Sequence, residues 1–284
     1  MNIYISGASG YLGKHLVEYF SDEHTVFAIK RSSSRVEGTC NFNVKYINCD
    51  LEDEVESYFK KYNPDIIINT VAVYGRGSES LSDIICSNVI FPAELYELAS
   101  KYKCAGFIHT GTSLPDNVSQ YSLSKNFIYK AICMDVNSKL KFINMSVEHF
   151  YGPNDGGNKF LPYIIDACLS NKRLELTAGT QQRDFIFIDD LVKAYACVVN
   201  NIDALEHKES IPVGSGVAVE VRDIVKKVHS QISSKSKLEF GKKDMRDNEL
   251  MYSCADISRL NKLGWSPLFD LDSGIASTLE GIKK

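Results

Sequence analysis

The sequence predicts an α/β fold in which a doubly wound parallel sheet is followed by a smaller C-terminal lobe. A glycine-rich turn follows a short apolar run at the N-terminus. Over residues 1–110, apolar segments of strand length alternate with segments of helical periodicity. Residues 66–72 form a nearly uninterrupted apolar run, which is typical of a parallel strand buried on both faces. Together these features predict a parallel sheet whose strands are connected by helices.

Length and composition limit the classes of function. The 284 residues are enough to bury a large core in one or two domains. A formal net charge of −4 gives no reason to expect nucleic acid as a partner. No segment approaches the ~20 apolar residues that cross a membrane, and the N-terminus lacks the basic and apolar regions of a signal peptide. The eight cysteines form no C-x-x-C pair, which favours reduced thiols over a disulfide framework or a zinc site. We therefore expect a cytoplasmic protein that does not contact a membrane.

The first thirteen residues predict a turn that binds phosphate. A strand at 1–6 runs through this turn into an amphipathic helix at 14–20. Gly7 lets the backbone leave the strand sharply, Gly10 leaves room for a phosphate, and Gly13 lets the helix pack closely on the strand. The free N–H groups and the positive dipole end of the helix attract an anion. We predict that a dinucleotide contacts Gly7, Ser9, Gly10, Tyr11, Leu12 and Gly13, with a plain glycine-rich turn as the alternative.

The end of the second predicted strand, residues 25–29, indicates which dinucleotide is bound. An acidic residue at this point would accept hydrogen bonds from the 2′-hydroxyl of NAD. Lys30 stands there instead, followed by Arg31 and Ser32. A guanidinium can bind two oxygens of a 2′-phosphate, and a serine can donate to it. The sequence therefore favours NADP(H) over NAD, and a solvated basic turn is the alternative.

The remaining elements of the first half alternate in the same way. The pattern predicts strands at 44–49, 66–72 and 105–110, and helices at 52–62 and 88–102. Beyond residue 151 the alternation weakens, and an amphipathic helix is predicted at 159–171. We expect a dinucleotide-binding core at 1–150 and a mainly substrate-binding lobe at 151–284. A segment at about 180–200 is expected to return to the core.

A hydroxyl residue, a tyrosine and a lysine follow the fifth predicted strand. Thr112 comes just after this strand, and Tyr121 and Lys125 lie nine and thirteen residues later. Tyrosine and lysine at i and i+4 share one face of a helix. An ammonium beside a phenol favours the phenolate and lowers the phenol pKa from its usual value of about 10. Tyr121 could then exchange a proton near neutral pH. A Y-x-x-x-K pair alone is usually a surface pair, but here it follows a nucleotide-binding turn.

With these motifs in order, the sequence resembles the extended short-chain dehydrogenase/reductase family of NAD-dependent epimerases and dehydratases, which have a Rossmann-type fold. Further similar segments lie at 144–154, 159–162, 182–191 and 263–265. Within the family, residues 181–188 and 246–253 most resemble reductases that make CDP-3,6-dideoxyhexoses, the paratose and abequose synthases. Such enzymes reduce a 4-keto sugar nucleotide with NADPH during synthesis of O-antigen and related cell-surface polysaccharides.

The resemblance implies a role for individual residues. Thr112 would hydrogen-bond the reacting oxygen, Tyr121 would be the acid, and Lys125 would hold the nicotinamide ribose. Further cofactor contacts are implied for Asp50, Leu51, Thr70, Val71, Ala72, Asn88, Val147 and Glu148. Substrate contacts are expected for Thr112, Ser113, Glu148, His149, Asn158, Lys159, Phe160, Arg183 and Arg246, the two arginines binding the diphosphate unless they form surface ion pairs. A homodimer through the helix bearing Tyr121 is implied, and no metal is expected.

Two departures from the family pattern narrow the reaction. Dehydratases of the family carry an Asp-Glu pair directly after the catalytic threonine, because elimination of water needs an extra acid and base. Ser113 and Leu114 stand there instead, which disfavours a dehydratase. Most members also have a longer segment between the hydroxyl residue and the tyrosine. The short segment here leaves one wall of the sugar pocket unassigned.

The sequence therefore predicts an NADPH-dependent reductase of the C4 ketone of a nucleoside-diphosphate 6-deoxy or 3,6-dideoxy sugar, with CDP favoured as the nucleotide. One alternative is a sugar-nucleotide 4-epimerase, which would share the catalytic residues and keep its NAD bound. An alternative of another class is a non-catalytic NADP-binding sensor or scaffold. The nucleotide base and the configuration of the product at C4 are left open.

Overall fold

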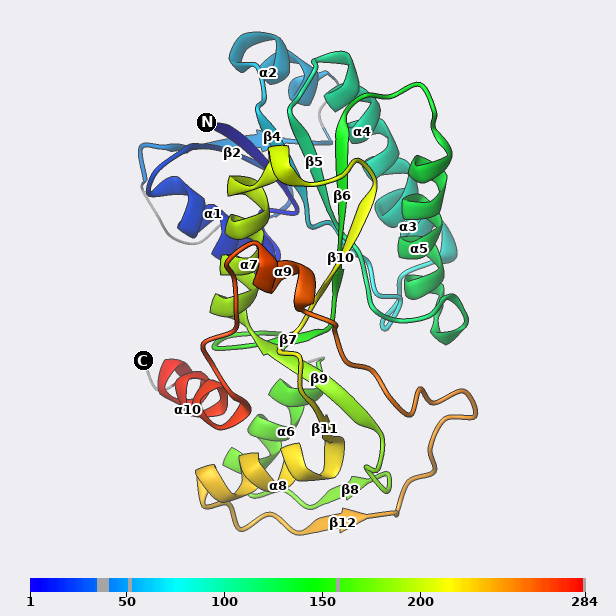
Figure 1. Cartoon of the computed structure of the whole chain (residues 1–284). Coiled ribbons are helices and arrows are strands. Elements are labelled where there is room, and N and C mark those ends of the chain that lie inside the picture. Colours follow the sequence, from blue (N-terminus) through cyan, green and yellow to red (C-terminus); the bar gives the residue numbers. More distant parts are fainter. Residues whose placement is uncertain (35–40, 51–52, 157–158, 283–284) are drawn as a thin grey trace. The chain divides into compact units, whose positions relative to one another are not determined.

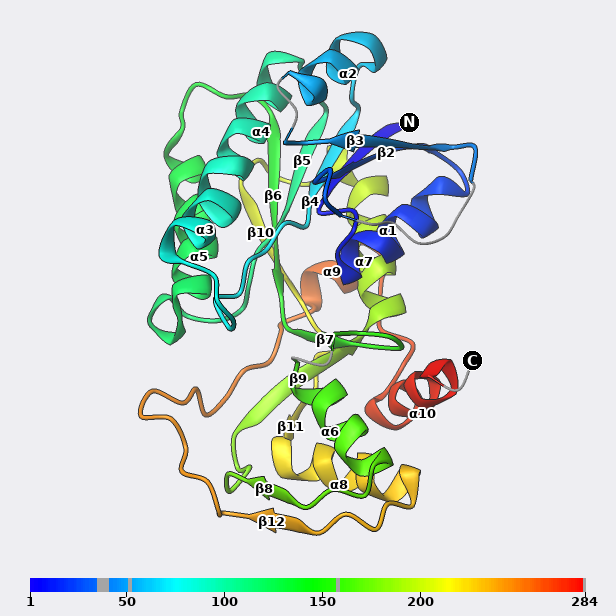
Figure 2. The same cartoon turned by 180° about the vertical axis from the view of Figure 1, so that it is seen from behind.

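The computed structural model describes residues 1–34, 41–50, 53–156 and 159–282 (Figures 1 and 2). The chain divides into two compact units, unit 1 comprising Met1–Ser146 and Val192–Ile211, and unit 2 comprising Val147–Leu191 and Pro212–Lys284. The first change of unit falls after residue 146. The chain returns to unit 1 at 192–211, which holds most of a long helix and the start of the strand that follows it.

Unit 1 is built on a seven-stranded sheet in the order β10-β6-β5-β4-β1-β2-β3. The strands are β1 (Asn2–Ser6), β2 (Thr25–Lys30), β3 (Val44–Asn48), β4 (Ile66–Asn69), β5 (Gly106–Thr110), β6 (Lys141–Val147) and β10 (Glu209–Val213). Strands β1 to β6 pair in parallel with their neighbours. This order, with crossovers on both sides of β1, is the doubly wound arrangement that the sequence predicts.

Helices cover both faces of this sheet. Their bounds are α1 (Tyr11–Ser21), α2 (Glu54–Tyr62), α3 (Leu81–Ile85), α4 (Phe91–Lys101), α5 (Gln120–Met134) and α7 (Ile188–Asn200), with a π-helix η1 (Cys86–Ile90) and 3₁₀ turns η2 (Asp116–Val118) and η3 (Ile202–Ala204). Figures 1 and 2 show α1 and α7 on one side of the sheet and α3, α4 and α5 on the other. An aromatic core that includes Tyr4, Phe27, Phe59, Phe107 and Phe142 fills the second side. Burial of each such side chain contributes about 1.5–3 kcal/mol.

Two predicted elements differ from the structure near the site. The strand expected at 66–72 ends at Asn69, because the Asn69 side chain accepts a hydrogen bond from the backbone N–H of Val71 and the chain then leaves the sheet. The helix expected at 88–102 begins earlier, at Leu81, and passes through the π-helix η1. Both differences concern the segment that follows the central strand of the sheet.

The strand register places polar side chains in a row at the carboxyl edge of the sheet. Ser6 pairs with Asn69, Asn69 with His109, and His109 with Asn144. The Ser6 hydroxyl donates to Asn69 Oδ1 at 2.7 Å, and Asn69 Nδ2 lies 3.0 Å from His109 Nδ1. The loops that follow β1, β4 and β5 therefore leave the sheet at one edge, where ligands of such folds bind.

In its described residues, unit 2 contains two small sheets, four complete helices and the start of α7. The sheets are β11-β9-β7 and β12-β8, with β7 (His149–Tyr151), β8 (Leu174–Leu176), β9 (Gln182–Phe187), β11 (Ala218–Glu220) and β12 (Leu238–Phe240). The helices are α6 (Phe160–Leu169), α8 (Val221–Ile232), α9 (Ser258–Lys262) and α10 (Leu271–Ile282). The buried Asp184 carboxylate accepts from the backbone N–H groups of Ser215, Gly216 and Ala255 and so ties three segments together. Within the described part of the chain, no helix is both long and apolar enough to cross a bilayer.

Candidate functional site

The glycine-rich turn between β1 and α1 leaves no room for a side chain at Gly7 or Gly13. Gly7 has a φ of +73°, and a Cβ there would lie 2.7 Å from the Thr70 hydroxyl oxygen. A Cβ on Gly13 would lie 2.2 Å from the Gly7 carbonyl oxygen. The first position needs a left-handed backbone and the second needs close contact of helix and strand, so glycine is required at both. These are the two roles that the sequence predicts for Gly7 and Gly13.

The N-terminus of α1 is left open to an anion. Gly10 is the N-cap residue and makes no side-chain capping bond, and the first turn contains no acidic residue. Neither the cap residue nor the first turn therefore places a side-chain oxygen or a carboxylate on the first N–H groups of the helix and its positive dipole end. This open helix end, next to a glycine-lined turn, fits the diphosphate of a dinucleotide.

The end of β2 holds a mixed set of charges rather than a purely basic one. Lys30 Nζ lies 3.1 Å from Asn48 Oδ1, and Arg31 is exposed. The backbone N–H and the hydroxyl of Ser32 both donate to the Asp50 carboxylate, at 2.8 and 2.6 Å, and these bonds lower the pKa of Asp50. Ser32 thus donates to Asp50 in this structure, and its donation to a 2′-phosphate stays a prediction. Leu51 lies outside the described residues.

The segment after β4 crosses the carboxyl edge of the sheet. The Thr70 hydroxyl donates to the Ser6 carbonyl oxygen at 2.7 Å, and the Val71 carbonyl oxygen accepts from Lys125 Nζ at 3.2 Å. Asn88, fully buried on the π-helix η1, accepts from Val73 N–H at 2.8 Å and donates to the Val73 carbonyl oxygen at 2.9 Å. The two Val73 contacts make Asn88 a support for this segment, whose Thr70, Val71 and Ala72 remain predicted cofactor contacts.

A short, capped connection brings Thr112 and Tyr121 together. After Thr112 the chain forms the single turn η2 and then Ser119, whose hydroxyl caps α5 by accepting from Ser122 N–H. Asn126 on α5 donates to the Leu114 carbonyl oxygen at 2.9 Å, so the connection packs against the helix that follows it. This local folding replaces the longer loop of the family.

Lys125 and Tyr121 lie on α5 with different surroundings from those that the sequence predicts. Lys125 is 1% exposed, and burial lowers its pKa to about 7. Burial raises the pKa of Tyr121 well above its usual value, and the nearby Tyr74 raises it further. A hydrogen bond with the Thr112 side chain acts in the opposite direction. The predicted lowering of the Tyr121 pKa by Lys125 is therefore wrong for this structure, because desolvation outweighs the attraction of any nearby cation.

The three side chains nevertheless form an arrangement suited to proton transfer. Thr112 is 8% exposed and its side chain lowers the pKa of Tyr121, and Lys125 Nζ reaches from α5 to the Val71 carbonyl oxygen in the segment after β4. A phenol with a raised pKa stays protonated at neutral pH and is a donor rather than an acceptor of protons. Unit 1 thus places a protonated phenol and a second hydroxyl at the edge of the sheet that carries the glycine-rich turn.

The predicted contacts Val147, Glu148 and His149 belong to unit 2. Glu148 is buried, and its Oε1 accepts from the Ser253 hydroxyl at 2.7 Å. His149 Nδ1 lies 3.9 Å from Glu148 Oε2, and the His149 ring packs on Phe185 with centroids 5.3 Å apart. His149 is therefore a packed side chain with one exposed edge, which fits either a bystander or a substrate contact.

The other predicted substrate contacts of unit 2 are cations and an aromatic residue. Lys159 pairs with Asp155 at 2.9 Å and lies 4.0 Å from the centroid of the Phe150 ring. Phe160 begins α6, and Asn158 lies outside the described residues. Arg183 Nη2 forms a 2.6 Å ion pair with Glu249, with only 7% of its side chain exposed, whereas Arg246 is exposed. Arg183 is therefore already paired within unit 2.

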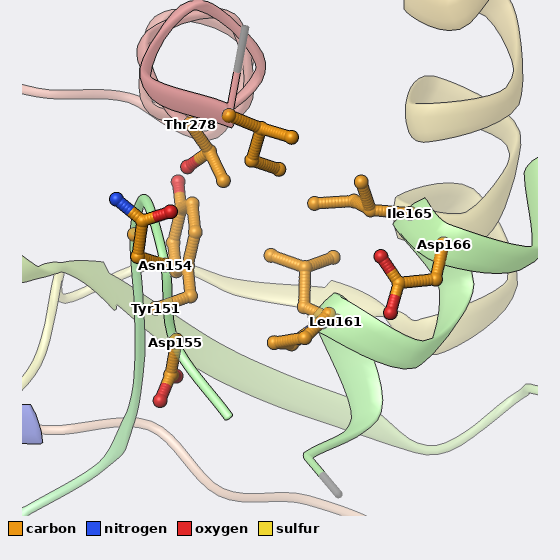
Figure 3. Close-up of a pocket in the computed structure, with 10 residues that line it drawn as sticks. Tyr151, Asn154, Asp155, Leu161, Ile165, Asp166 and Thr278 are labelled. Atoms are coloured by element: carbon orange, nitrogen blue, oxygen red, sulfur yellow. The ribbon is translucent and has the colours of Figure 1, made fainter. Parts of the chain in front are cut away.

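Unit 2 also has a pocket of about 200 Å³ that the sequence does not predict (Figure 3). It lies between α6, α10 and the turn after β7, and its lining is Tyr151, Gly152, Asn154, Asp155, Leu161, Pro162, Ile165, Asp166, Thr278 and Ile282. Figure 3 shows the Tyr151 hydroxyl directed toward Thr278. Lys159 and Phe160 are not among the lining residues, but Asp155, the ion-pair partner of Lys159, is.

Sequence reasoning missed two residues beside Tyr121. The Tyr74 ring lies 4.7 Å from the Tyr121 ring, and the Arg76 guanidinium lies 5.2 Å from the Tyr74 centroid. Both follow the central strand β4, and residues after such strands line ligand sites in this fold class. That position in the chain is the signal that could have identified them.

Comparisons with known proteins agree with this geometry. Residues 3–214 match the model of the NAD dependent epimerase/dehydratase family. The chain is 35% identical to a CDP-abequose synthase of Salmonella typhimurium over 98% of its length and 97% of the relative, and 29% identical to a CDP-abequose synthase of Salmonella muenchen. The crystal structure of a UDP-glucose 4-epimerase from Thermotoga maritima has the same fold, with a TM-score of 0.86, 20% identity and coverage of 100% and 99% of the two chains.

Proposed function

The chain belongs to the NAD dependent epimerase/dehydratase family, and from this premise we propose that it is an NADPH-dependent reductase of a sugar-nucleotide ketone. Its substrate would be a nucleoside-diphosphate 6-deoxy or 3,6-dideoxy sugar, reduced at C4. The observation that carries the proposal is the meeting of Thr112 and the protonated Tyr121 at the sheet edge that bears the open N-terminus of α1. The product would serve cell-surface polysaccharide synthesis.

The chain's own residues would handle the proton and the oxygen. A bound reduced nicotinamide would supply the hydride. Tyr121 would donate its phenolic proton to the oxygen that develops negative charge, and the Thr112 hydroxyl would hydrogen-bond that oxygen. Lys125 would hold the ribose next to the nicotinamide. Water would then return a proton to Tyr121, so the net change is the reduction of one carbonyl group to a hydroxyl group.

NADPH is proposed as the reductant because of the cations at the end of β2. Lys30 and the exposed Arg31 stand where an acid would select NAD. Asp50 is the opposing observation, since it brings a carboxylate to the same turn through Ser32. A 2′-phosphate would be bound by the guanidinium and repelled by Asp50. NADH therefore belongs in the test as a competing reductant.

A CDP-linked ketone is the proposed substrate. The two relatives named above are CDP-abequose synthases, and the similarity to the Salmonella typhimurium protein extends over nearly the whole chain. Ser113 and Leu114, in place of an Asp-Glu pair, give no second acid and base for elimination of water. In unit 2, Arg246, Lys159 and His149 are the proposed contacts of the diphosphate and the sugar. Arg183 would contribute through its pair with Glu249 or after exchanging that partner for a phosphate.

A homodimer is also proposed, through the outer face of α5 and the neighbouring α3. Leu123, Phe127 and Met134 on α5 are exposed, as are Leu81 and Ile85 on α3. The opposite face of α5 carries the buried Lys125, so the helix has an apolar side turned away from the site. A contiguous apolar surface of this kind is typical of an interface. A second copy of the chain is the partner that the family resemblance implies.

The proposal is tested by turnover with a panel of ketones. The purified chain is incubated with NADPH or NADH and with CDP-, dTDP- or GDP-linked 4-keto-6-deoxy sugars, and the absorbance of the reduced nicotinamide is followed. We expect oxidation of NADPH with the CDP-linked ketone and loss of that activity by at least about a hundredfold in Tyr121→Phe. No oxidation with any ketone would reject the reductase. Copurified NAD, together with interconversion of C4 epimers and no net oxidation, would establish the epimerase instead.

A further inference from the structure

Tyr74 and Arg76 form a stack on the proposed acid. The rings of Tyr74 and Tyr121 have centroids 4.7 Å apart with 34° between their planes. The guanidinium carbon of Arg76 lies 5.2 Å from the centroid of the Tyr74 ring. The first contact is within the range of attractive aromatic pairs, and the second is a cation–π contact. We call these three side chains the arginine–tyrosine stack.

The segment that carries Tyr74 and Arg76 is held in place on both sides. Asn88 binds both backbone groups of Val73, and its Nδ2 also donates to the Ser124 hydroxyl of α5 at 2.9 Å. Gly75 has a φ of +65°, and a Cβ there would lie 2.8 Å from Ile84 Cδ1. The turn that places Tyr74 over Tyr121 is therefore fixed by the fold, rather than being one conformation of a free loop.

Cations nearby stabilise an acid that has lost its proton. The Lys125 Nζ donates to the Val71 carbonyl oxygen, and burial lowers the pKa of Lys125 to about 7. A guanidinium stays charged throughout the working range of pH. Arg76 is exposed, which lets it keep its hydration while it lies over the stack.

We propose that Tyr74 is a positioning residue that fixes the ring of Tyr121, and that Arg76 is the permanent cation that eases the loss of the Tyr121 proton. The inference rests on the proposed reductase function, in which Tyr121 is the acid. The inference adds a cation, Arg76, that would stabilise the ionised Tyr121 and does not belong to the Thr-Tyr-Lys set.

Side chains from three parts of unit 1 act on Tyr121: Tyr74 and Arg76 come from the segment after β4, Thr112 follows β5, and Tyr195 is on α7. Lys125 lies one turn further along α5. Burial, Tyr74 and Tyr195 raise the pKa of Tyr121, whereas Thr112 and Arg76 lower it. Removal of Arg76 should therefore raise that pKa.

The kinetic test uses the reverse reaction, oxidation of the sugar alcohol with NADP⁺, in which Tyr121 must accept a proton. The rate rises with pH as Tyr121 ionises. In Arg76→Gln we expect the profile to move to higher pH by about half a unit, a roughly threefold lower rate at a given pH, with KM within about twofold. Arg76→Lys should restore most of the rate. Lys130→Gln, which removes an exposed cation from the same helix α5, should leave the profile in place. An unmoved profile in Arg76→Gln would overturn the role of Arg76.

The role of Tyr74 is tested by the size of the side chain. Tyr74→Phe keeps the ring and should retain most of kcat, whereas Tyr74→Ala should lose about tenfold in kcat because the acid is no longer held. Equal losses in both variants, or a change in KM alone, would contradict a positioning role.

A spectroscopic signature separates this inference from the function on which it rests. With 3-fluorotyrosine incorporated, the ¹⁹F signal of Tyr121 is identified by its absence in Tyr121→Phe. It should shift in Tyr74→Ala and Arg76→Gln and stay unchanged in Lys130→Gln. Turnover with an unmoved signal would overturn the arginine–tyrosine stack. A shifted signal without reduction of any ketone would overturn the proposed function, and with it the role given to Arg76.

Discussion

At the scale of the residue, the site depends on a lysine that is costly to bury. Lys125 is 1% exposed, and its folded pKa of about 7 lies far below the usual 10.5. At pH values below about 7 both the folded and the unfolded chain carry the proton, and the folded state bears the full cost of burying a charge. As pH rises above 7 the folded state loses the proton first, so stability increases. A residue kept at such a cost is typical of a functional site.

Lys125→Met should therefore stabilise the fold while abolishing activity. We expect a gain on the order of a few kcal/mol at pH 6, since one unit of pKa shift corresponds to about 1.4 kcal/mol. The gain should shrink at pH 9, where the wild-type lysine is largely neutral in the folded state. Urea unfolding at the two pH values measures both quantities.

The exposed Lys130 on the same helix is the matched control, because it pairs with Asp116 at the surface. Lys130→Met should change stability by less than about 1 kcal/mol, with no such dependence on pH. If Lys125→Met is less stable than the wild type at pH 6, the buried ammonium of Lys125 does not destabilise the folded state.

The sequence predicts which residues meet at the site better than it predicts their electrostatics. Thr112, Tyr121 and Lys125 follow from their order along the chain, because strand ends of a parallel sheet share one edge. The direction of the Tyr121 pKa does not follow, since it depends on how deeply the phenol is buried and on Tyr74, which is remote in sequence. The engagement of Ser32 by Asp50 likewise depends on the pairing of two strands.

At the scale of the element, the turn from β1 to α1 is tightly constrained by close packing of the helix on the strand. Gly13→Ala would place a methyl group 2.2 Å from the Gly7 carbonyl oxygen, so the helix must move away from the strand. We expect a loss of about 1–3 kcal/mol in stability and at least tenfold weaker binding of NADPH, measured by urea unfolding and fluorescence titration. Gly156→Ala is the control, because nothing lies within 4 Å of its added Cβ. A Gly13→Ala protein that binds NADPH normally would rule out the close-packing role.

The π-helix η1 is a second element on which the stability of the site depends. It carries Asn88, whose side chain makes two bonds to the Val73 backbone and one to Ser124. Asn88→Ala should lose about 2–4 kcal/mol in urea unfolding, because the backbone groups of Val73 lose their partner. Asn126→Ala removes a bond to the Leu114 carbonyl oxygen and a contact with the Asp116 carboxylate, both near the surface, and should lose about 1 kcal/mol. Equal losses in the two variants would show that Asn88 does not brace the segment.

Element positions could be predicted from apolar periodicity, but element ends could not. The run at 66–72 looks like one strand, yet the Asn69 side chain accepts a hydrogen bond from the Val71 N–H, and the strand ends there. The helix that starts at Leu81 begins with a capping box of Ser80 and Asp83, a signal that was available in the sequence. The π-helix that follows has no comparable signature, because its extra residue is accommodated by packing.

At the scale of the whole molecule, the outer face of α5 and α3 predicts the oligomeric state. Phe127 is 56% exposed in the single chain, at the centre of the apolar side of α5. Phe127→Glu would bury a charge at the proposed interface, so we expect the variant to sediment as a monomer where the wild type is a dimer. Tyr19→Glu, on α1, changes a similarly exposed residue and should remain dimeric. A monomeric wild-type protein would exclude this interface.

The fold class could be predicted from sequence because alternating strands and helices leave few arrangements. The division of the chain into two units is harder to predict from the sequence. Residues 192–211 rejoin unit 1 because α7 contributes buried side chains such as Ala194 and Tyr195 and leads into β10 at the edge of the sheet. No change in composition marks that return, since both units have apolar helices.

The central claim is that hydride passes from NADPH to C4 of a sugar nucleotide while Tyr121 supplies the proton. The most direct test is transfer of deuterium from the reduced nicotinamide carbon of labelled NADPH, with the product analysed by mass spectrometry and NMR. The account predicts a single deuterium at C4 of the sugar and an equal amount of NADP⁺, with neither in Tyr121→Phe. A product without deuterium, or a C4 epimer formed with no NADP⁺, would contradict it.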